Sequence, residues 1–140
     1  SFYKINPNRI ILEILEGVSS IGKKNHIKQL TLLKSKGFKI AIDDFGMGHT
    51  SVTYLKTDLF DVVKLDGSIT RNVLQNKNDQ EIISSLISLS RILHLQVIAE
   101  FVDNVPQRDK LAELGCDAFQ GYLYSRPIGL NELLQLTDKK

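Results

Sequence analysis

The sequence of 140 residues has one cysteine, no tryptophan and only three prolines, and it contains no long apolar run. A single cysteine cannot form an internal disulfide, which excludes a disulfide-stapled secreted domain and fits a reducing compartment. We expect Cys116 to be an ordinary packed thiol, because unpaired cysteines are among the most buried side chains. A bilayer-spanning helix needs roughly 20 apolar residues, and no stretch of this chain approaches that length.

The sequence also carries almost no excess of positive or negative charge, since the formal net charge is only +2. The densest basic pairs, Lys23-Lys24 and Lys139-Lys140, look like solvated segments, and the other basic residues are scattered. Duplex nucleic acid is recognised through a concentrated basic patch, which this sequence lacks, so we expect no such partner. A hydrophobic content of 42% and a charged content of 24% are typical of a soluble globular domain with a core of its own.

Strand and helix patterns alternate along the whole chain. Buried apolar runs predict strands at residues 10–14, 38–42, 61–65, 96–99 and 118–119. Helical spacing of apolar residues predicts helices at 24–35, 50–56, 79–93 with Asp79 as N-cap, 106–114 opened at or near Asn104 and closed by Gly115, and 130–137. This pattern predicts an α/β fold with about five parallel strands covered by helices. Composition leaves open whether the sheet is doubly wound or part of a (β/α) barrel.

Acidic and polar residues follow the predicted strands. The carboxyl ends of parallel strands meet at one edge of a sheet, so we expect these side chains to converge there. Carboxylate oxygens suit Mg²⁺ or Mn²⁺, and an adjacent lysine could position a water for attack on a phosphodiester. A single strand-end acid is more commonly a helix cap or a surface partner, but the recurrence favours a site. The residues are Glu13 and Glu16, Asp43 and Asp44, Lys64 and Asp66, Glu100 and Asp103, and Gln120.

The segments that carry these residues resemble successive motifs of the EAL domain family, in order and in spacing. The resemblance implies a TIM-like barrel that hydrolyses cyclic di-GMP to the linear dinucleotide pGpG with Mg²⁺ or Mn²⁺ at a two-metal site. The segments are Leu12-Glu13-Ile14-Leu15-Glu16, Asp43-Asp44-Phe45-Gly46-Met47-Gly48, Val63-Lys64-Leu65-Asp66, Ala99-Glu100-Phe101-Val102-Asp103 and Gln120-Gly121-Tyr122-Leu123-Tyr124-Ser125-Arg126-Pro127.

The resemblance also implies roles for individual residues. Glu13, Asp43, Asp44 and Glu100 look like metal ligands, with Asp43 as the bridge, and Asp66 is a further metal or water contact. Lys64 resembles the residue that orients the attacking water, and Glu100 is also a candidate proton acceptor. The remaining candidates that the resemblance implies are Glu16, which would hold the loop after Asp44, and Gln120, which would complete the site. Asp103 is a further candidate for contact with the nucleotide. Arg126 is a candidate for contact with a phosphate, and the alternative is a surface residue before Pro127.

The chain departs from the family pattern in two ways. It contains neither the Glu-Ala-Leu motif nor the Asn-bearing strand that follows it. Several residues also differ from the usual ones, which affects the loop geometry and the fit of the substrate. They are Met47, His49 and Thr50 in the loop after the acid pair, Leu59, Phe101 in place of Gly, Asp103 in place of Glu, and Asn104.

By the family layout, residues 1–140 form the C-terminal portion of a single EAL-like domain, and therefore a partial barrel, because a complete one takes about 250 residues. We expect this portion alone to be inactive and to self-associate as a homodimer or swapped oligomer, since an open sheet exposes its edges. We expect other signalling domains upstream and a bacterial cytoplasmic location, with tethering through those domains. The alternative function is a non-catalytic EAL-like module that binds cyclic di-GMP or a protein partner.

Overall fold

Five parallel strands form one sheet in the computed structural model, which describes residues 5–15, 24–45 and 55–137. The strands pair in chain order, so each connection moves to the neighbouring position, as in a (β/α) barrel. This confirms the predicted α/β class, the parallel sheet and the number of strands. The strands are β1 (Ile11–Leu15), β2 (Lys39–Phe45), β3 (Val62–Leu65), β4 (Gln96–Ala99) and β5 (Ala118–Phe119).

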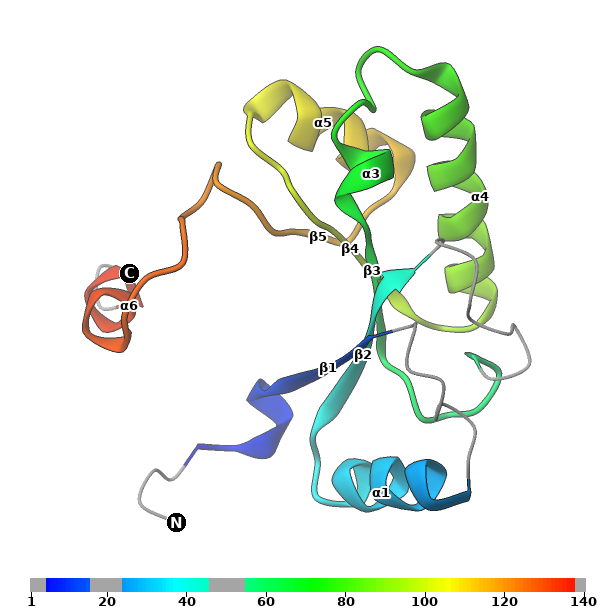
Figure 1. Ribbon diagram of the computed structural model, residues 1–140, viewed down its shortest axis with the longest axis vertical. Coiled ribbons are helices and arrows are strands. Elements are labelled where there is room, and N and C mark those ends of the chain that lie inside the picture. Colours follow the sequence, from blue (N-terminus) through cyan, green and yellow to red (C-terminus); the bar gives the residue numbers. More distant parts are fainter. Residues whose placement is uncertain (1–4, 16–23, 46–54, 138–140) are drawn as a thin grey trace.

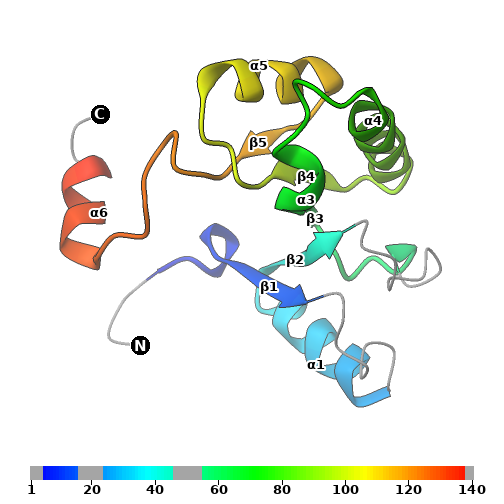
Figure 2. The ribbon, with the colours of Figure 1, turned by 45° about the horizontal axis from the view of Figure 1, so that its top comes forward.

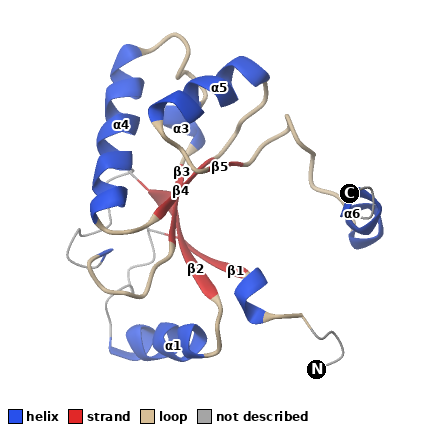
Figure 3. Ribbon diagram, turned by 180° about the vertical axis from the view of Figure 1, so that it is seen from behind, coloured by secondary structure: helices blue, strands red, loops and turns tan. Residues whose placement is uncertain are grey.

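Helices cover the outer side of the curved row of strands (Figure 2). α1 (Lys24–Ser35) packs against β2, and α4 (Lys77–Ile92) packs against β4 and against α5 (Val105–Leu114). α6 (Leu130–Thr137) stands apart from the sheet at the end of an extended segment, as both Figure 1 and Figure 3 show. Within the described residues, no helix combines the length and apolar character that crossing a membrane requires.

The two faces of the sheet differ in chemistry because side chains alternate along each strand. In the strand register, Ile42, Val63 and Val97 lie in one row, and they belong to the buried core beneath the helices. The intervening positions, which include Glu13 on β1 and Lys64 on β3, point to the other face. The same alternation that builds the core therefore places the candidate polar residues together on the inner face.

Two local predictions need correction, and one short helix was not predicted. α4 begins at Lys77 and not at Asp79, because Asn76 is the N-cap: its Oδ1 accepts hydrogen bonds from the backbone N–H groups of Asn78 (2.9 Å) and Asp79 (3.3 Å). A short helix, α3 (Gly67–Thr70), was not predicted, because four residues are too few to show a helical period. β2 extends to Phe45, beyond the predicted end at residue 42.

Other local predictions are confirmed. Asn104 opens α5 by accepting from the Gln107 N–H at 2.9 Å, and Gly115 closes it with a φ of 109°. Cys116 is buried, and burial, with a smaller contribution from Asp117, raises the pKa of its thiol to about 12. It is therefore a packed, unreactive thiol at neutral pH. The predicted helix at 50–56 falls largely outside the described residues.

Candidate functional site

The ammonium group of Lys64 lies among three carboxylates on the inner face of the sheet. Its Nζ is 2.5 Å from Glu100 Oε1, 2.9 Å from Glu13 Oε1 and 3.4 Å from Asp43 Oδ1. Glu13 comes from β1, Asp43 from β2 and Lys64 from β3, while Glu100 directly follows β4. The sheet thus brings together four residues that are spread over 88 positions of the sequence, from 13 to 100. The predicted convergence of these four side chains is observed.

A bulge in β2 explains how two adjacent acids can serve the same site. In a regular strand Asp43 and Asp44 would point to opposite faces. Instead, the register against β3 shifts between Ile42 and Phe45, and Asp44 takes a left-handed φ of 58°. The Asp44 N–H also donates to Asp43 Oδ1 at 3.1 Å. Bulges of this kind re-aim a side chain beside functional sites, and here both carboxylates turn to one side.

Three carboxylates of this cluster could hold a metal ion. Asp43, Asp44 and Glu100 each offer an oxygen atom, and these atoms lie within 4.8 Å of one another. All three are half-buried, and hard oxygen donors of this type are what Mg²⁺ and Mn²⁺ prefer. The donor set therefore fits a divalent cation.

The electrostatics of the cluster reflect an excess of negative charge. Burial lowers the pKa of Lys64, but the hydrogen bonds to Glu100 and Glu13 and the nearby charges outweigh it and hold this pKa above its ordinary value. Burial raises the pKa of Glu100, and the charges of Asp43 and Glu13 add to the rise against the opposing effect of Lys64. Lys64 is only 2% exposed, so it is a fixed, protonated cation in the centre of the acids.

A pocket of about 490 Å³ adjoins the cluster. Gln120 and Asp103 both line it. Asp103 Oδ1 also accepts from the Tyr122 N–H at 3.4 Å. The pocket thus offers an amide, carboxylates and a cation next to aromatic surface. Its lining residues are Arg71, Glu100, Phe101, Asp103, Gln120, Gly121 and Tyr122.

The other candidate residues have contacts of a different kind. Asp66 is the N-cap of α3, since its Oδ1 accepts from the Ser68 N–H at 2.8 Å, which is the capping alternative left open by the sequence. Burial raises its pKa, but the bonds from Ser68 and Gly67 and the charge of Arg71 lower it overall. Arg126 stacks on the Tyr122 ring at 4.8 Å, at the edge of the pocket. Glu16, Met47 and His49 lie outside the described residues.

Gln107 is a buried positioning residue behind the pocket, and the sequence does not predict this role. Its amide is 3% exposed, and its Nε2 donates to the carbonyl oxygens of Phe101 (2.9 Å) and Thr70 (3.1 Å). Its Oε1 accepts from the Asp103 N–H at 2.9 Å. Gln107 therefore fixes the turn that carries Glu100 and Asp103 and ties it to α3. Nothing in the sequence distinguishes this glutamine from a surface residue of an amphipathic helix.

Gly121 provides a test of how tightly this edge of the sheet is packed. A Cβ at this position would lie 2.2 Å from the Val102 carbonyl oxygen, which is backbone and has little room to move. We expect Gly121→Ala to destabilise the fold by about 1–3 kcal/mol, the usual range for overpacking. Gly129→Ala is the matched control, because a Cβ there meets nothing within 4 Å. Urea unfolding of the two variants measures the difference, and equal midpoints would contradict the expectation.

A family model described as EAL domain matches residues 1–127. The chain belongs to the EAL domain family. This confirms the resemblance seen in the motifs, and the sheet of five parallel strands agrees with the TIM-like barrel that EAL domains form.

Individual EAL proteins show how far the similarity extends. The chain is 37% identical over 132 residues to the cyclic di-GMP phosphodiesterase PdeF of Escherichia coli, which covers 94% of the chain and 18% of PdeF. A structure of PaMucR phosphodiesterase in complex with c-di-GMP superposes with a TM-score of 0.81 at 32% identity, over 92% of this chain and 52% of that one. A manganese and cyclic di-GMP complex of Klebsiella pneumoniae BlrP1 gives a TM-score of 0.77 at 30% identity, over 88% and 31% of the two chains. The chain spans less than a fifth of the length of curated relatives such as PdeF.

Proposed function

We propose that the protein carrying this EAL domain sequence hydrolyses cyclic di-GMP to linear pGpG with the help of Mg²⁺ or Mn²⁺. The observation that carries the proposal is the cluster in which oxygens of Asp43, Asp44 and Glu100 lie within 4.8 Å of one another, with the buried Lys64 paired to Asp43 and Glu100. Similarity to PdeF, and to structures of BlrP1 with manganese or calcium and cyclic di-GMP, supports both the substrate and a divalent metal.

The residues that would hold the metal ions are Glu13, Asp43, Asp44 and Glu100, with Asp43 as the bridge between two ions. Asp66 is a weaker candidate, because its Oδ1 is already engaged by the Ser68 N–H. Bound divalent ions would stabilise charge on the phosphoryl oxygens and lower the pKa of a bound water.

The protein groups would then place the attacking water. Lys64, fixed by its surroundings and protonated, would donate a hydrogen bond that orients the water, and the Glu100 carboxylate would accept its proton. The water oxygen would form a bond to phosphorus while the bond from phosphorus to the 3′ oxygen breaks. The leaving 3′ oxygen would take up a proton, which leaves a linear dinucleotide with a 5′ phosphate.

The pocket beside the cluster would bind the rest of the substrate. Gln120 and Asp103 line it and could hydrogen-bond a base, and the Tyr122 ring adds apolar surface. Arg126, which stacks on the pocket residue Tyr122, would meet a phosphate. Glu16 would hold the loop after Asp44.

Product analysis tests the proposal. The natural-length protein is incubated with cyclic di-GMP and Mn²⁺ or Mg²⁺, and the nucleotides are separated by chromatography. We expect pGpG with either metal and none in EDTA, and we expect residues 1–140 alone to give no product. Asp109→Asn, an exposed acid that pairs with Arg108, is a control that should retain full activity. Binding of cyclic di-GMP without pGpG under saturating metal would overturn the proposal and favour a non-catalytic module.

Assembly and location are further parts of the proposal. β1 and β5 are the edges of the described sheet, and the β1 side chains Ile11 and Leu15 are 42% and 56% exposed. Exposed edges of this kind favour pairing with another copy, so we expect residues 1–140 alone to form a homodimer or swapped oligomer. A monodisperse monomer in sedimentation would contradict it. Because the relatives are bacterial proteins that include a signaling protein, we expect signalling domains upstream and a site of action in the bacterial cytoplasm.

A further inference from the structure

The turn after β4 contains a strained residue at the edge of the pocket. Phe101 has a φ of 54°, a left-handed conformation that is unfavourable for a bulky side chain. Such outliers persist only where the surrounding structure enforces them, and they concentrate at functional sites. Here the Gln107 amide holds the Phe101 carbonyl at 2.9 Å. A part-buried hydrogen bond therefore holds the backbone in this strained conformation.

Other contacts also hold the phenyl ring of Phe101 in place. A Cβ added to Gly67 would lie 2.3 Å from Phe101 Cδ2, so the ring rests directly on the backbone of α3. The guanidinium of Arg71, at the end of the same helix, stacks on this ring with Cζ 4.0 Å from the ring centre. Phe101 thus serves as a platform for Arg71.

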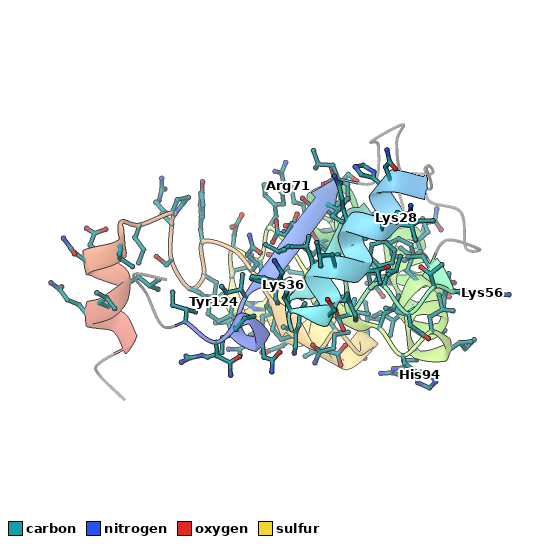
Figure 4. The ribbon with its side chains drawn as sticks, turned by 90° about the horizontal axis from the view of Figure 1, so that it is seen from below. Lys28, Lys36, Lys56, Arg71, His94 and Tyr124 are labelled. Carbon is teal, nitrogen blue, oxygen red and sulfur yellow. The ribbon has the colours of Figure 1, made fainter. Side chains whose placement is uncertain are left out.

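The stacked guanidinium is placed for a ligand. Arg71 lines the pocket beside Glu100 and Gln120, and it is the cation among the lining residues. Figure 4 shows Arg71 on the side of the molecule where the β1 arrow ends, which is the carboxyl edge of the sheet, while His94 lies on the opposite side. Among the described residues no carboxylate lies within ion-pair distance of Arg71, and only the charge of Asp66 acts on it from farther away, whereas Lys64 is surrounded by acids. Stacking leaves the N–H groups at the edge of the guanidinium available for acceptors in its plane.

We propose that Arg71, held on the Phe101 ring, is a substrate-binding residue that donates paired hydrogen bonds to a group with two adjacent acceptors. In the substrate class proposed above, on which this inference rests, two groups have that chemistry: the phosphodiester oxygens and the O6/N7 edge of guanine. The Gly67, Phe101 and Gln107 contacts serve to keep the guanidinium in place before the ligand arrives.

The experiment compares Arg71→Ala, Phe101→Leu and the double variant in the natural-length protein. We measure KM and kcat for cyclic di-GMP with Mn²⁺, and the inhibition constant of cyclic di-AMP, which carries the same phosphodiester ring but presents an amino group in place of O6. Losing a charge-assisted hydrogen-bond donor should raise KM by about 10- to 100-fold in Arg71→Ala. Phe101→Leu should show part of that increase, and the double variant should be no worse than Arg71→Ala, because both substitutions act on one contact.

Two controls separate binding from damage to the fold or the cluster. Arg91→Ala removes the same charge at the far end of α4 and should leave KM unchanged. Mn²⁺ affinity, measured by electron paramagnetic resonance, should be the same in Arg71→Ala and the unmodified protein. If KM for cyclic di-GMP and the inhibition constant of cyclic di-AMP rise together, Arg71 binds the phosphodiester; if only the KM rises, it reads the guanine edge.

The result that overturns the inference is an unchanged KM in Arg71→Ala, or a rise matched by Arg91→Ala. Additive effects in the double variant would show that Phe101 does not act through Arg71. If the unmodified protein gives no pGpG, the proposed hydrolysis fails, and calorimetric titration of cyclic di-GMP into the unmodified protein and Arg71→Ala decides the inference separately.

Discussion

Replacing Lys64 with methionine is expected to lower kcat for cyclic di-GMP hydrolysis by about a thousandfold, within the range by which a positioned acid–base group accelerates a reaction. Lys64 Nζ contacts Glu13, Asp43 and Glu100, and methionine keeps most of the volume but none of the charge. The water would lose the donor that orients it, and the carboxylates would lose the cation that separates them. Steady-state kinetics with saturating Mn²⁺ measures the effect.

The same substitution should also change stability in a pH-dependent way. Without metal, removing one partner of a buried ion pair costs about 3–5 kcal/mol, and Mn²⁺ should restore part of this by supplying positive charge. The pKa of Glu100 is already raised above 4.5, and without Lys64 it should rise further. A raised carboxyl pKa contributes stability that is present below about 4.5 and is lost as pH rises through the folded-state pKa, so Lys64→Met should regain stability on acidification from pH 7.

The stability of the fold at alkaline pH provides a second measurement. The pKa of Lys64 lies above its ordinary value of 10.5, so the folded state keeps a proton that the unfolded state loses as pH rises past that value. The unmodified protein should therefore lose stability above pH 10.5 through Lys64, and Lys64→Met should lack this contribution. Urea unfolding in EDTA across the pH range follows both effects.

Lys34→Met is the matched control for Lys64→Met. Lys34 also forms an ion pair, with Asp61 at 2.7 Å, but its side chain is 28% exposed. A partly exposed pair contributes about 0–1 kcal/mol, so we expect little change in stability and none in kcat. Equal losses in the two lysine variants would contradict a special role for Lys64.

Replacing Asp43 with asparagine should weaken Mn²⁺ binding by more than about 100-fold, since even residues that only support a metal ligand contribute 10- to 100-fold. Asparagine has nearly the same shape but no charge, and Asp43 is the proposed bridge. Hydrolysis should fall by about a thousandfold at fixed metal. This fall corresponds to about 4 kcal/mol of lost transition-state stabilisation, because each 1.36 kcal/mol is tenfold in rate. Calorimetric titration with Mn²⁺ and product analysis measure the two losses.

A distinctive feature of Asp43→Asn is its effect in the absence of metal. The substitution removes one of the charges that crowd Glu100, so the metal-free protein should be no less stable than the unmodified one. Asp109→Asn, at an exposed ion pair on α5, should change neither metal affinity nor activity. Retention of full Mn²⁺ affinity by Asp43→Asn would show that the cluster is not the metal site.

Much of the arrangement follows from strand periodicity. Glu13 and Lys64 each lie within a short apolar run. Because these runs form parallel strands whose carboxyl ends align, the two residues were predictable as neighbours. The α5 cap at Asn104 and its closure by Gly115 were also predictable, since caps depend on adjacent residues. The start of α4 was not, because Asn76 and Asp79 are both good N-caps and packing decides between them.

The sequence by itself determined the number of strands, their parallel direction and the residue types at the carboxyl edge of the sheet, since these depend on short-range periodicity and on the alternation of strands with helices. Only the tertiary structure decided how those residues meet. The bulge that turns Asp43 and Asp44 to one side depends on the register with β3. The platform that Phe101 offers to Arg71 depends on contacts between residues 30 positions apart or more, such as the Thr70 hydroxyl bonded to the Glu100 carbonyl. No local pattern encodes such contacts, because their free energy arises from groups that meet only in the folded chain.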